Sequence, residues 1–179
     1  MPDLQRFVEA QEHSFSRALK EIRNGRKQSH WMWYGFPQIQ GLGHSPAALR
    51  YAIQDIQEAK DYLHDAILGP RLEEICGAAL EVECSDPGIV FGYPDDLKLR
   101  SSMTLFAAAD PGNGLFGKVL EKYFNGERDQ KTLDILASQE RKEMDSCLLS
   151  TLSQVGGSVN PGTLREAPTD GWSRGPIDE

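Results

Sequence analysis

The sequence predicts an all-α fold: a compact single domain of about eight short helices, followed by a flexible C-terminal tail. Apolar residues recur at helical spacing through most of residues 4–137. Gly, Pro and Asn residues divide this pattern into short segments. Alternation of apolar and polar residues, which is typical of strands, never extends beyond a few positions, and no repeat of fixed period occurs. These observations favour helices throughout.

Short helices are predicted near the N-terminus, at residues 4–8 and 15–22, each with an apolar face at helical spacing. Asn24-Gly25 ends the second of these helices. Ser29 then caps a short aromatic turn. Pro37 ends this turn, because the residue before a proline avoids the helical region.

In the middle of the chain, proline residues mark where helices begin again. Ser45-Pro46 is typical of a helix start, and this helix should bend or restart near Gln54-Asp55 before it ends at Leu63. Gly69-Pro70 restarts the chain once more, and the clearest amphipathic pattern follows at residues 72–80.

Further helices are predicted towards the C-terminus, after a short turn at residues 85–92. Each is bounded by Pro, Gly or Asn residues, and they cover residues 95–109, 115–124 and 129–137.

These segments divide the chain into three parts. Residues 1–138 should form the helical domain. Residues 139–154 can extend the last helix, because Met144 and Leu148 lie four positions apart on one face. Residues 155–179 include eight Gly or Pro residues among 25 and few apolar ones, so we expect a disordered tail.

Composition narrows the class of function. The 179 residues include 19 Lys and Arg against 27 Asp and Glu, a net charge of −8. A chain this acidic has no overall attraction to nucleic acid or anionic lipid, and we expect to find neither as a partner. The longest apolar stretch is too short to span a membrane, and the first residues do not resemble a signal peptide.

The cysteines indicate the compartment. Cys76, Cys84 and Cys147 are odd in number and have no CxxC spacing, which is typical of reduced thiols in a cytoplasmic protein. We expect a soluble cytoplasmic monomer.

The stretch "SHWMWYGFPQIQGLGHSP", residues 29–46, gathers aromatic side chains on several sides of one short turn. Such a segment is either buried as part of the core or lines a pocket, because exposing several large rings would be costly. Gly41 and Gly43 favour the pocket slightly, since they allow the backbone to approach closely. Free backbone N–H groups in this loop, just before the helix that Ser45-Pro46 begins, also suggest an anion site.

The stretch "YPDDLKLRSSMTLF", residues 93–106, places charges on a helix that is apolar on nearly every side. Asp95 and Asp96 suit the first turn, where carboxylates complement the helix dipole. Lys98 and Arg100 are harder to explain, because a charge on a mostly buried helix is costly unless it is paired or faces a wet cavity. A polar cavity and a structural network of ion pairs are both consistent with this pattern.

Motifs of well-known chemistries are absent. The sequence has no GxxxxGK[ST], no HExxH and no GxSxG, and its four histidines are scattered. We therefore expect no metal and no cofactor. His30, between Ser29 and Trp31, is the one histidine that we place in a candidate site.

Four blocks of sequence resemble the bacterial and fungal domain-of-unknown-function family 1810: "SHWMWYGFPQIQGLGHSPAALRYAI", "EAKDYLHDAILGPRL", "PDDLKLRSSMTLF" and "VLEKYFNGERDQKTLDIL". The resemblance covers roughly residues 3–138 in the expected order. It implies a compact, mainly α-helical domain and no established activity. The residues at motif positions of the family are His30, Trp31, Trp33, Pro37, Gln38, Tyr51, Asp95, Lys98, Ser101 and Thr104.

Our first hypothesis is a pocket for a small anionic metabolite, nucleotide-like or phosphate-bearing, where the aromatic segment meets the helix at 95–104. A tryptophan would stack on a planar group, and basic side chains would offset the negative charge. The expected ligand-binding residues are Trp31, Trp33, Gln38, Tyr51, Lys98, Arg100 and Ser101.

If the pocket is catalytic, His30 with Asp95 or Asp96 could act as general acid and base in a hydrolytic reaction. If the pocket forms, whether or not it is catalytic, His30 should line it within about one or two side-chain lengths of Lys98 or Ser101. The alternative hypothesis is a non-enzymatic helical module that recognises a protein partner.

Overall fold

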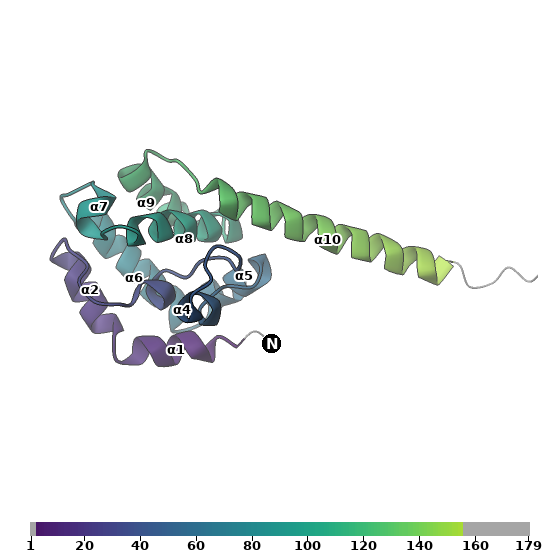
Figure 1. The fold of residues 1–179 in the computed structure, drawn as a ribbon, viewed down its shortest axis with the longest axis horizontal. Coiled ribbons are helices and arrows are strands. Elements are labelled where there is room, and N and C mark those ends of the chain that lie inside the picture. The colour runs from purple at the N-terminus through teal and green to yellow at the C-terminus, as the bar shows by residue number, and fades with distance from the viewer. Residues whose placement is uncertain (1–2, 156–179) are drawn as a thin grey trace, which may run out of the picture. The chain divides into compact units, whose positions relative to one another are not determined.

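The computed structural model describes residues 3–155, which form ten helices (Figure 1). In chain order they are α1 (Gln5–Glu12), α2 (Phe15–Arg23), α3 (Met32–Gly35), α4 (Pro46–Arg50), α5 (Ile56–His64), α6 (Leu68–Glu81), α7 (Pro87–Val90), α8 (Asp95–Ala109), α9 (Gly114–Phe124) and α10 (Gln130–Val155). Extended pairing within this range is limited to one isolated parallel bridge, between Ile39 and Ile53. The all-α prediction is confirmed.

The number of helices is slightly higher than the expected eight or so, and the helix predicted to bend or restart near Gln54-Asp55 is two separate helices, α4 and α5. Between α4 and α5, the Ile53 N–H donates to the Gln38 carbonyl, and the Gln40 N–H donates to the Ile53 carbonyl, both at 2.8 Å. These bonds hold the chain extended at Ile53. The Asp55 side chain then caps α5 by accepting the Glu58 N–H.

Helix α6 begins at Leu68, four residues earlier than the pattern predicts. The Asp65 carboxylate accepts the backbone N–H groups of Ile67 and Leu68, both at 2.9 Å. Pro70 therefore falls in the first turn, where the missing N–H costs no helical hydrogen bond.

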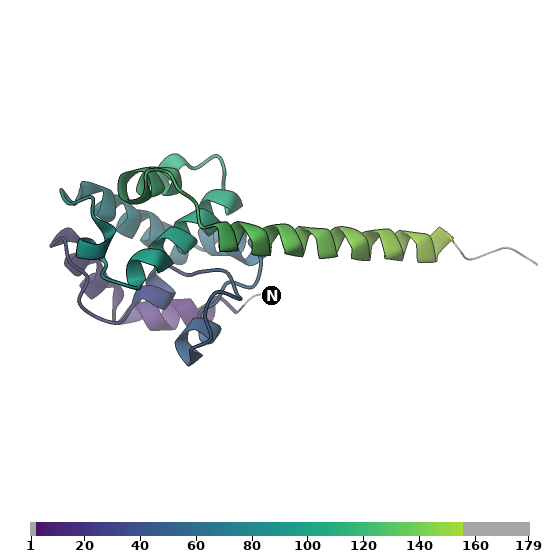
Figure 2. The same cartoon turned by 45° about the horizontal axis from the view of Figure 1, so that its top comes forward.

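Helix α8 is the centre of the core. It packs against α3, α5, α7 and α9, and it lies in the middle of the helices in Figure 1. Every residue from Ser101 to Ala107 is buried. A helix with protein on all sides needs no polar face, which explains why apolar residues occur all around it. Figure 2 shows the short α4, by contrast, at the edge of the structure.

Two compact units divide the described part of the chain, one up to Glu143 and one from Met144 onward. Helix α10 is continuous from Gln130 to Val155 and so passes through residues 139–154. Beyond Val155, the tail expected at 155–179 lies outside the described residues. Among the described helices, none is both long enough and apolar enough to cross a bilayer.

A buried carboxylate holds the loop that leads into the aromatic segment. Glu21 accepts the N–H groups of Gln28 at 2.8 Å and Ser29 at 3.0 Å, and also accepts the Ser29 hydroxyl. The Trp31 indole donates to the same carboxylate at 2.8 Å. Burial raises the pKa of Glu21, but these hydrogen bonds outweigh it and lower the pKa to about 2.

Replacing Glu21 by Gln should therefore destabilise the fold by about 2–3 kcal/mol at pH 7, because each unit of pKa shift corresponds to about 1.4 kcal/mol. The pKa in the folded protein lies below the ordinary value of 4.5, so this stabilisation is complete above that value and declines as the pH falls towards about 2. Urea unfolding at pH 7 and at about pH 3 should show the gap between wild type and Glu21→Gln shrinking by half or more. The matched control is Glu74→Gln, which makes the same change at an exposed position. If the difference in free energy of unfolding between wild type and Glu21→Gln is equal at both pH values, the lowered pKa of Glu21 does not stabilise the fold.

Candidate functional site

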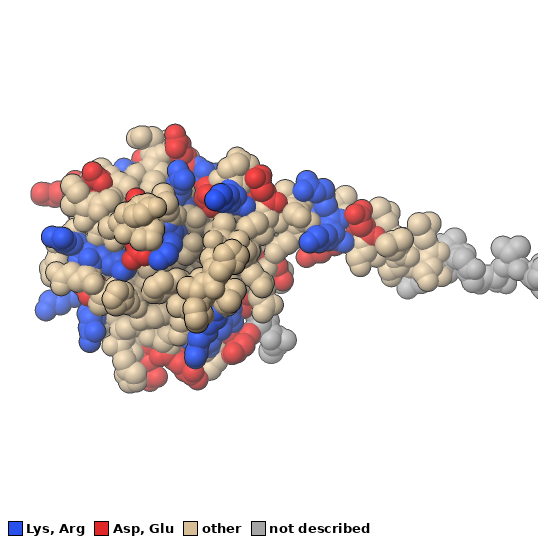
Figure 3. Space-filling model, viewed as in Figure 1, with Lys and Arg blue, Asp and Glu red and all other residues tan. Residues whose placement is uncertain are grey.

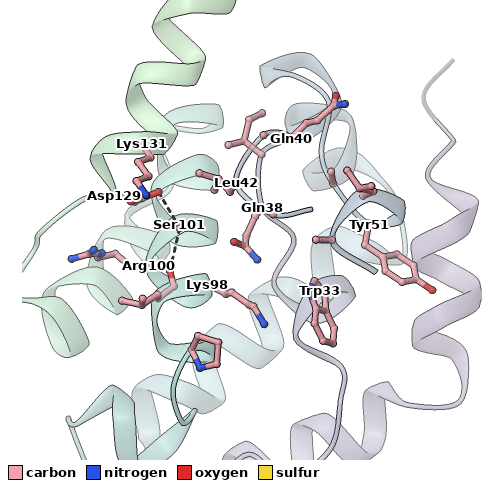
Figure 4. Close-up of a pocket in the computed structure, with 18 residues that line it drawn as sticks. Trp33, Gln38, Gln40, Leu42, Tyr51, Lys98, Arg100, Ser101, Asp129 and Lys131 are labelled. Carbon is pink, nitrogen blue, oxygen red and sulfur yellow. Dashed lines mark hydrogen bonds between the residues drawn. The ribbon is translucent and has the colours of Figure 1, made fainter. Parts of the chain in front are cut away.

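A cavity of about 310 Å³ opens between the aromatic segment and helix α8 (Figure 4). Its walls come from α3 and the loop after it, from α4 and the residues that follow, and from the starts of α8 and α10. The residues that line it are Trp33, Gln38, Ile39, Gln40, Gly41, Leu42, Gly43, Ala48, Leu49, Tyr51, Ala52, Pro94, Leu97, Lys98, Arg100, Ser101, Asp129 and Lys131. This volume is at the lower end of the range of small-molecule sites.

The loop at residues 38–43 is fixed by its pairing with Ile53 and by close contact with α4. Gly41 has a φ of +106°, which L side chains rarely adopt. A Cβ on Gly43 would lie 2.7 Å from the Ala48 side chain, so this position has no room for one. The two glycines allow the loop to form one wall of the cavity.

The opposite wall presents Lys98, whose position is set by a bridging carboxylate. Asp95 holds the Lys98 ammonium at 2.7 Å through one oxygen and the Lys27 ammonium at 2.6 Å through the other. Burial raises the pKa of Asp95, but hydrogen bonds and charge attraction from both lysines outweigh it, and the pKa is lowered. The Lys27 side chain is only 6% exposed, so Asp95 is its necessary counter-charge.

Each of these two lysines also lies over a tryptophan ring. The Lys98 ammonium is 4.3 Å from the Trp33 ring centroid, and the Lys27 ammonium is 5.2 Å from the Trp31 ring centroid. Both distances suit a cation–π interaction. The bridge thereby ties both tryptophans of the aromatic segment to the first turn of α8.

Six residues of the expected site line the cavity: Trp33, Gln38, Tyr51, Lys98, Arg100 and Ser101. Gln38 and Lys98 face each other across it in Figure 4. Arg100 contributes its stem, while its guanidinium points away, towards Glu127 at 3.8 Å and the Phe124 ring at 6.0 Å. The Tyr51 ring packs on Phe7 and Tyr34.

Trp31, the other expected ligand-binding residue, does not line the cavity. It is 1% exposed, and its indole donates to Glu21 in the core. The expectation that its ring could stack on a ligand is therefore wrong, because Glu21 draws the ring inward.

The expected catalytic residues are also absent from the lining. His30 is exposed at the surface and is not among the residues that line the cavity. Its neighbours Ser29 and Trp31 are both held by Glu21, which leaves the intervening histidine facing outward. Asp95 is engaged with its two lysines, and Asp96 lies outside the lining. The structure does not assemble the predicted pair of acid and base.

Asp129 is a functional candidate that sequence reasoning used only as a helix start. It is 9% exposed, and one oxygen accepts the hydroxyl of Ser101 at 3.0 Å and that of Thr132 at 2.6 Å. Its backbone N–H donates to Thr104 at 2.9 Å. The sequence contains no signal for this contact, because the hydroxyls of Ser101 and Thr104 can also donate to the carbonyls of Leu97 and Arg100 within α8, as they do here.

Lys131 lines the cavity as well and was not expected to. In the part of the chain that the structure describes, no three His, Cys, Asp or Glu side chains are grouped closely enough to hold a metal ion. The lining offers instead ammonium, amide, hydroxyl and carboxylate groups, which suit hydrogen bonding to a small polar molecule.

Over the described residues, fold and cavity together define an all-α domain with a concave site of mixed polarity between its aromatic segment and its central helix. The family model described as a protein of unknown function (DUF1810) matches residues 1–136, and the chain belongs to this family. The crystal structure of the conserved hypothetical protein Rv1873 from Mycobacterium tuberculosis is similar, with 49% sequence identity and a TM-score of 0.74. The match covers 75% of this chain and 96% of that one. A search of curated proteins gave no match.

Replacing Asp95 by Asn should destabilise the protein by about 2–4 kcal/mol, because it leaves the buried Lys27 without a counter-charge. Asp96→Asn is the matched control on the adjacent residue, which forms no ion pair among the described residues. It should cost less than about 1 kcal/mol, the usual scale for a charge at a helix end. Chemical denaturation at pH 7 measures both changes. If both variants lose the same free energy of unfolding, the ion pairs of Asp95 with Lys27 and Lys98 do not stabilise the fold as we expect.

Proposed function

We propose that the cavity binds a small anionic metabolite, nucleotide-like or phosphate-bearing, that also has a planar or apolar part. The observation that carries the proposal is the Lys98 ammonium, held on the wall of the cavity with the Gln38 amide facing it. Ammonium, amide and hydroxyl donors around one space are the groups that bind phosphate and carboxylate oxygens.

The charge around the cavity supports an anionic ligand. The ammonium-bearing residues Lys98 and Lys131 line it against the single carboxylate of Asp129, although the chain as a whole carries a net charge of −8. On the face seen in Figure 3, basic and acidic side chains are interspersed. Asp95 does not cancel Lys98, because one carboxylate is shared between two lysines and the group keeps a net positive charge.

The rest of the lining supports a ligand that is only partly polar. Leu42, Leu49 and Leu97 offer apolar contact area. One face of Trp33 is already covered by the Lys98 ammonium, so a planar group would pack against the ring's other face or its edge.

Binding is favoured over hydrolysis. His30 and Asp95 are both outside the lining, and the two oxygens of Asp95 are occupied by Lys27 and Lys98, so neither residue is placed to act as acid or base in the cavity. The proposal therefore assigns recognition to Lys98, Gln38 and Ser101 and assigns no acid or base.

The alternative from the sequence, a helical module for protein recognition, is favoured by one different observation. Four large apolar side chains of α10 are each at least 60% exposed: Met144, Leu148, Leu149 and Leu152. Such a group suits contact with another protein. This function would leave the cavity without a role, and for that reason we place it second.

Thermal shift assays with inorganic phosphate, glucose 6-phosphate and AMP test the binding proposal. At least one of these anions should raise the melting temperature, by about 2–4 °C for each kcal/mol of binding stabilisation in a chain of this size. Lys98→Ala should lose the shift, measured against its own ligand-free melting temperature. Lys118→Ala, which removes an exposed lysine of α9 outside the cavity, should keep it. An equal shift in both variants would contradict the role of Lys98.

A further inference from the structure

Asp129 lies in the cavity with one carboxylate oxygen unused. Oδ2 accepts three hydrogen bonds, from the Ser101 hydroxyl, the Thr132 hydroxyl and the Thr132 N–H at 3.2 Å. Oδ1 accepts none from the described residues, yet it is not among the sealed polar atoms. Since the residue is 9% exposed and lines the cavity, this oxygen is its remaining open acceptor there.

The carboxylate also has no cation partner in the described part of the chain. No lysine or arginine nitrogen lies within ion-pair distance of it, Lys131 included. Capping α10 accounts for Oδ2, because the Thr132 N–H is one of the free donors of the first turn. Capping does not explain why Oδ1, which shares the negative charge, is left without a partner in a cavity whose other charged groups attract anions. A carboxylate oxygen can only accept, so its partner must be a hydrogen-bond donor.

We propose that the ligand of this cavity carries an amino group in addition to its anionic group, and that Asp129 Oδ1 accepts a hydrogen bond from it. This inference rests on the proposed function and names the substrate class: small phosphate-bearing metabolites with an amine, such as amino-sugar phosphates or aminopurine nucleotides. Lys98 binds the anionic end, and Asp129 selects the donor end.

The arrangement of these groups fits a ligand with its two ends several bonds apart. Lys98 and Ser101 are three residues apart on α8, which places their Cβ atoms about 5–6 Å from each other. Ser101 in turn contacts Asp129. Figure 4 shows the three along one wall, with Gln38 opposite. A sugar ring between a phosphate and an amine spans such a distance.

Isothermal titration calorimetry on the full chain with two matched pairs tests the inference. Glucosamine 6-phosphate is compared with glucose 6-phosphate, and AMP with purine riboside 5′-monophosphate, which lacks only the amino group. In at least one pair the amino compound should bind about tenfold tighter or more, the usual scale for a hydrogen bond to a charged group.

Asp129→Asn should abolish this preference. Asparagine caps a helix about as well as aspartate, so α10 should stay intact, while an amide N–H₂ placed at Oδ1 would repel the ligand's amine and not accept from it. The compound without the amine should bind the variant at least as tightly as wild type. Asp55→Asn, which makes the same change at the N-cap of α5 outside the cavity, should leave the preference unchanged.

The outcomes separate the two proposals. If wild type binds both members of each pair equally, and Lys98→Ala loses both, the inference about Asp129 is overturned and the anion site stands. If Asp129→Asn keeps the full preference, the amine is recognised elsewhere and the inference is again overturned. If none of the four compounds binds wild type, both this inference and the phosphate-binding function fail. Equal binding of both members of each pair by wild type overturns the inference whether or not the variant folds.

Discussion

The Asp95 carboxylate is the contact on which the candidate site depends. It joins Lys27, in the loop after α2, to Lys98 on the central helix, and each lysine lies over one tryptophan of the aromatic segment. A buried lysine without a counter-charge would cost several kcal/mol, so the loop and the helix must meet at this point. Because one carboxylate is shared between two ammonium groups, the three residues keep a net positive charge. Lys98 is the member of this group that lines the cavity.

The Glu21 carboxylate is a second contact on which the site depends, because it places one tryptophan of the aromatic segment in the core and leaves the other at the cavity. By accepting hydrogen bonds from Ser29 and the Trp31 indole, it seals the first tryptophan in the core. A buried indole needs such an acceptor for its N–H. Trp33, two positions later, then falls on the cavity side beside Lys98. The same run of sequence therefore serves both the core and the site.

Much of this arrangement could be predicted from local pattern. Charges on a helix that is apolar all round indicated either a polar cavity or a network of ion pairs, and Lys98 has both, because it lines the cavity and pairs with Asp95. The side on which each aromatic residue falls could not be predicted, because it is decided by Glu21, ten residues before Trp31. The place of Asp129 in the cavity could not be predicted for the same reason, because its partner Ser101 is 28 positions away. A bend or restart near Gln54-Asp55 could be predicted, but the pairing of Ile53 with Ile39, which lies outside α4 and α5, could not be. Such distant pairings leave no periodic trace in a single sequence.

The central claim is that the cavity beside Trp33 binds a small anion through Lys98. A titration of the ¹⁵N-labelled chain with inorganic phosphate, followed by two-dimensional NMR, tests it most directly. The account predicts progressive shifts of the Trp33 indole N–H, the Gln38 side-chain amide and the backbone amides of residues 97–101. The Trp31 indole N–H, bound to Glu21 in the core, should hardly move. No shifts at these positions, or equal shifts of the two indoles, would contradict the account.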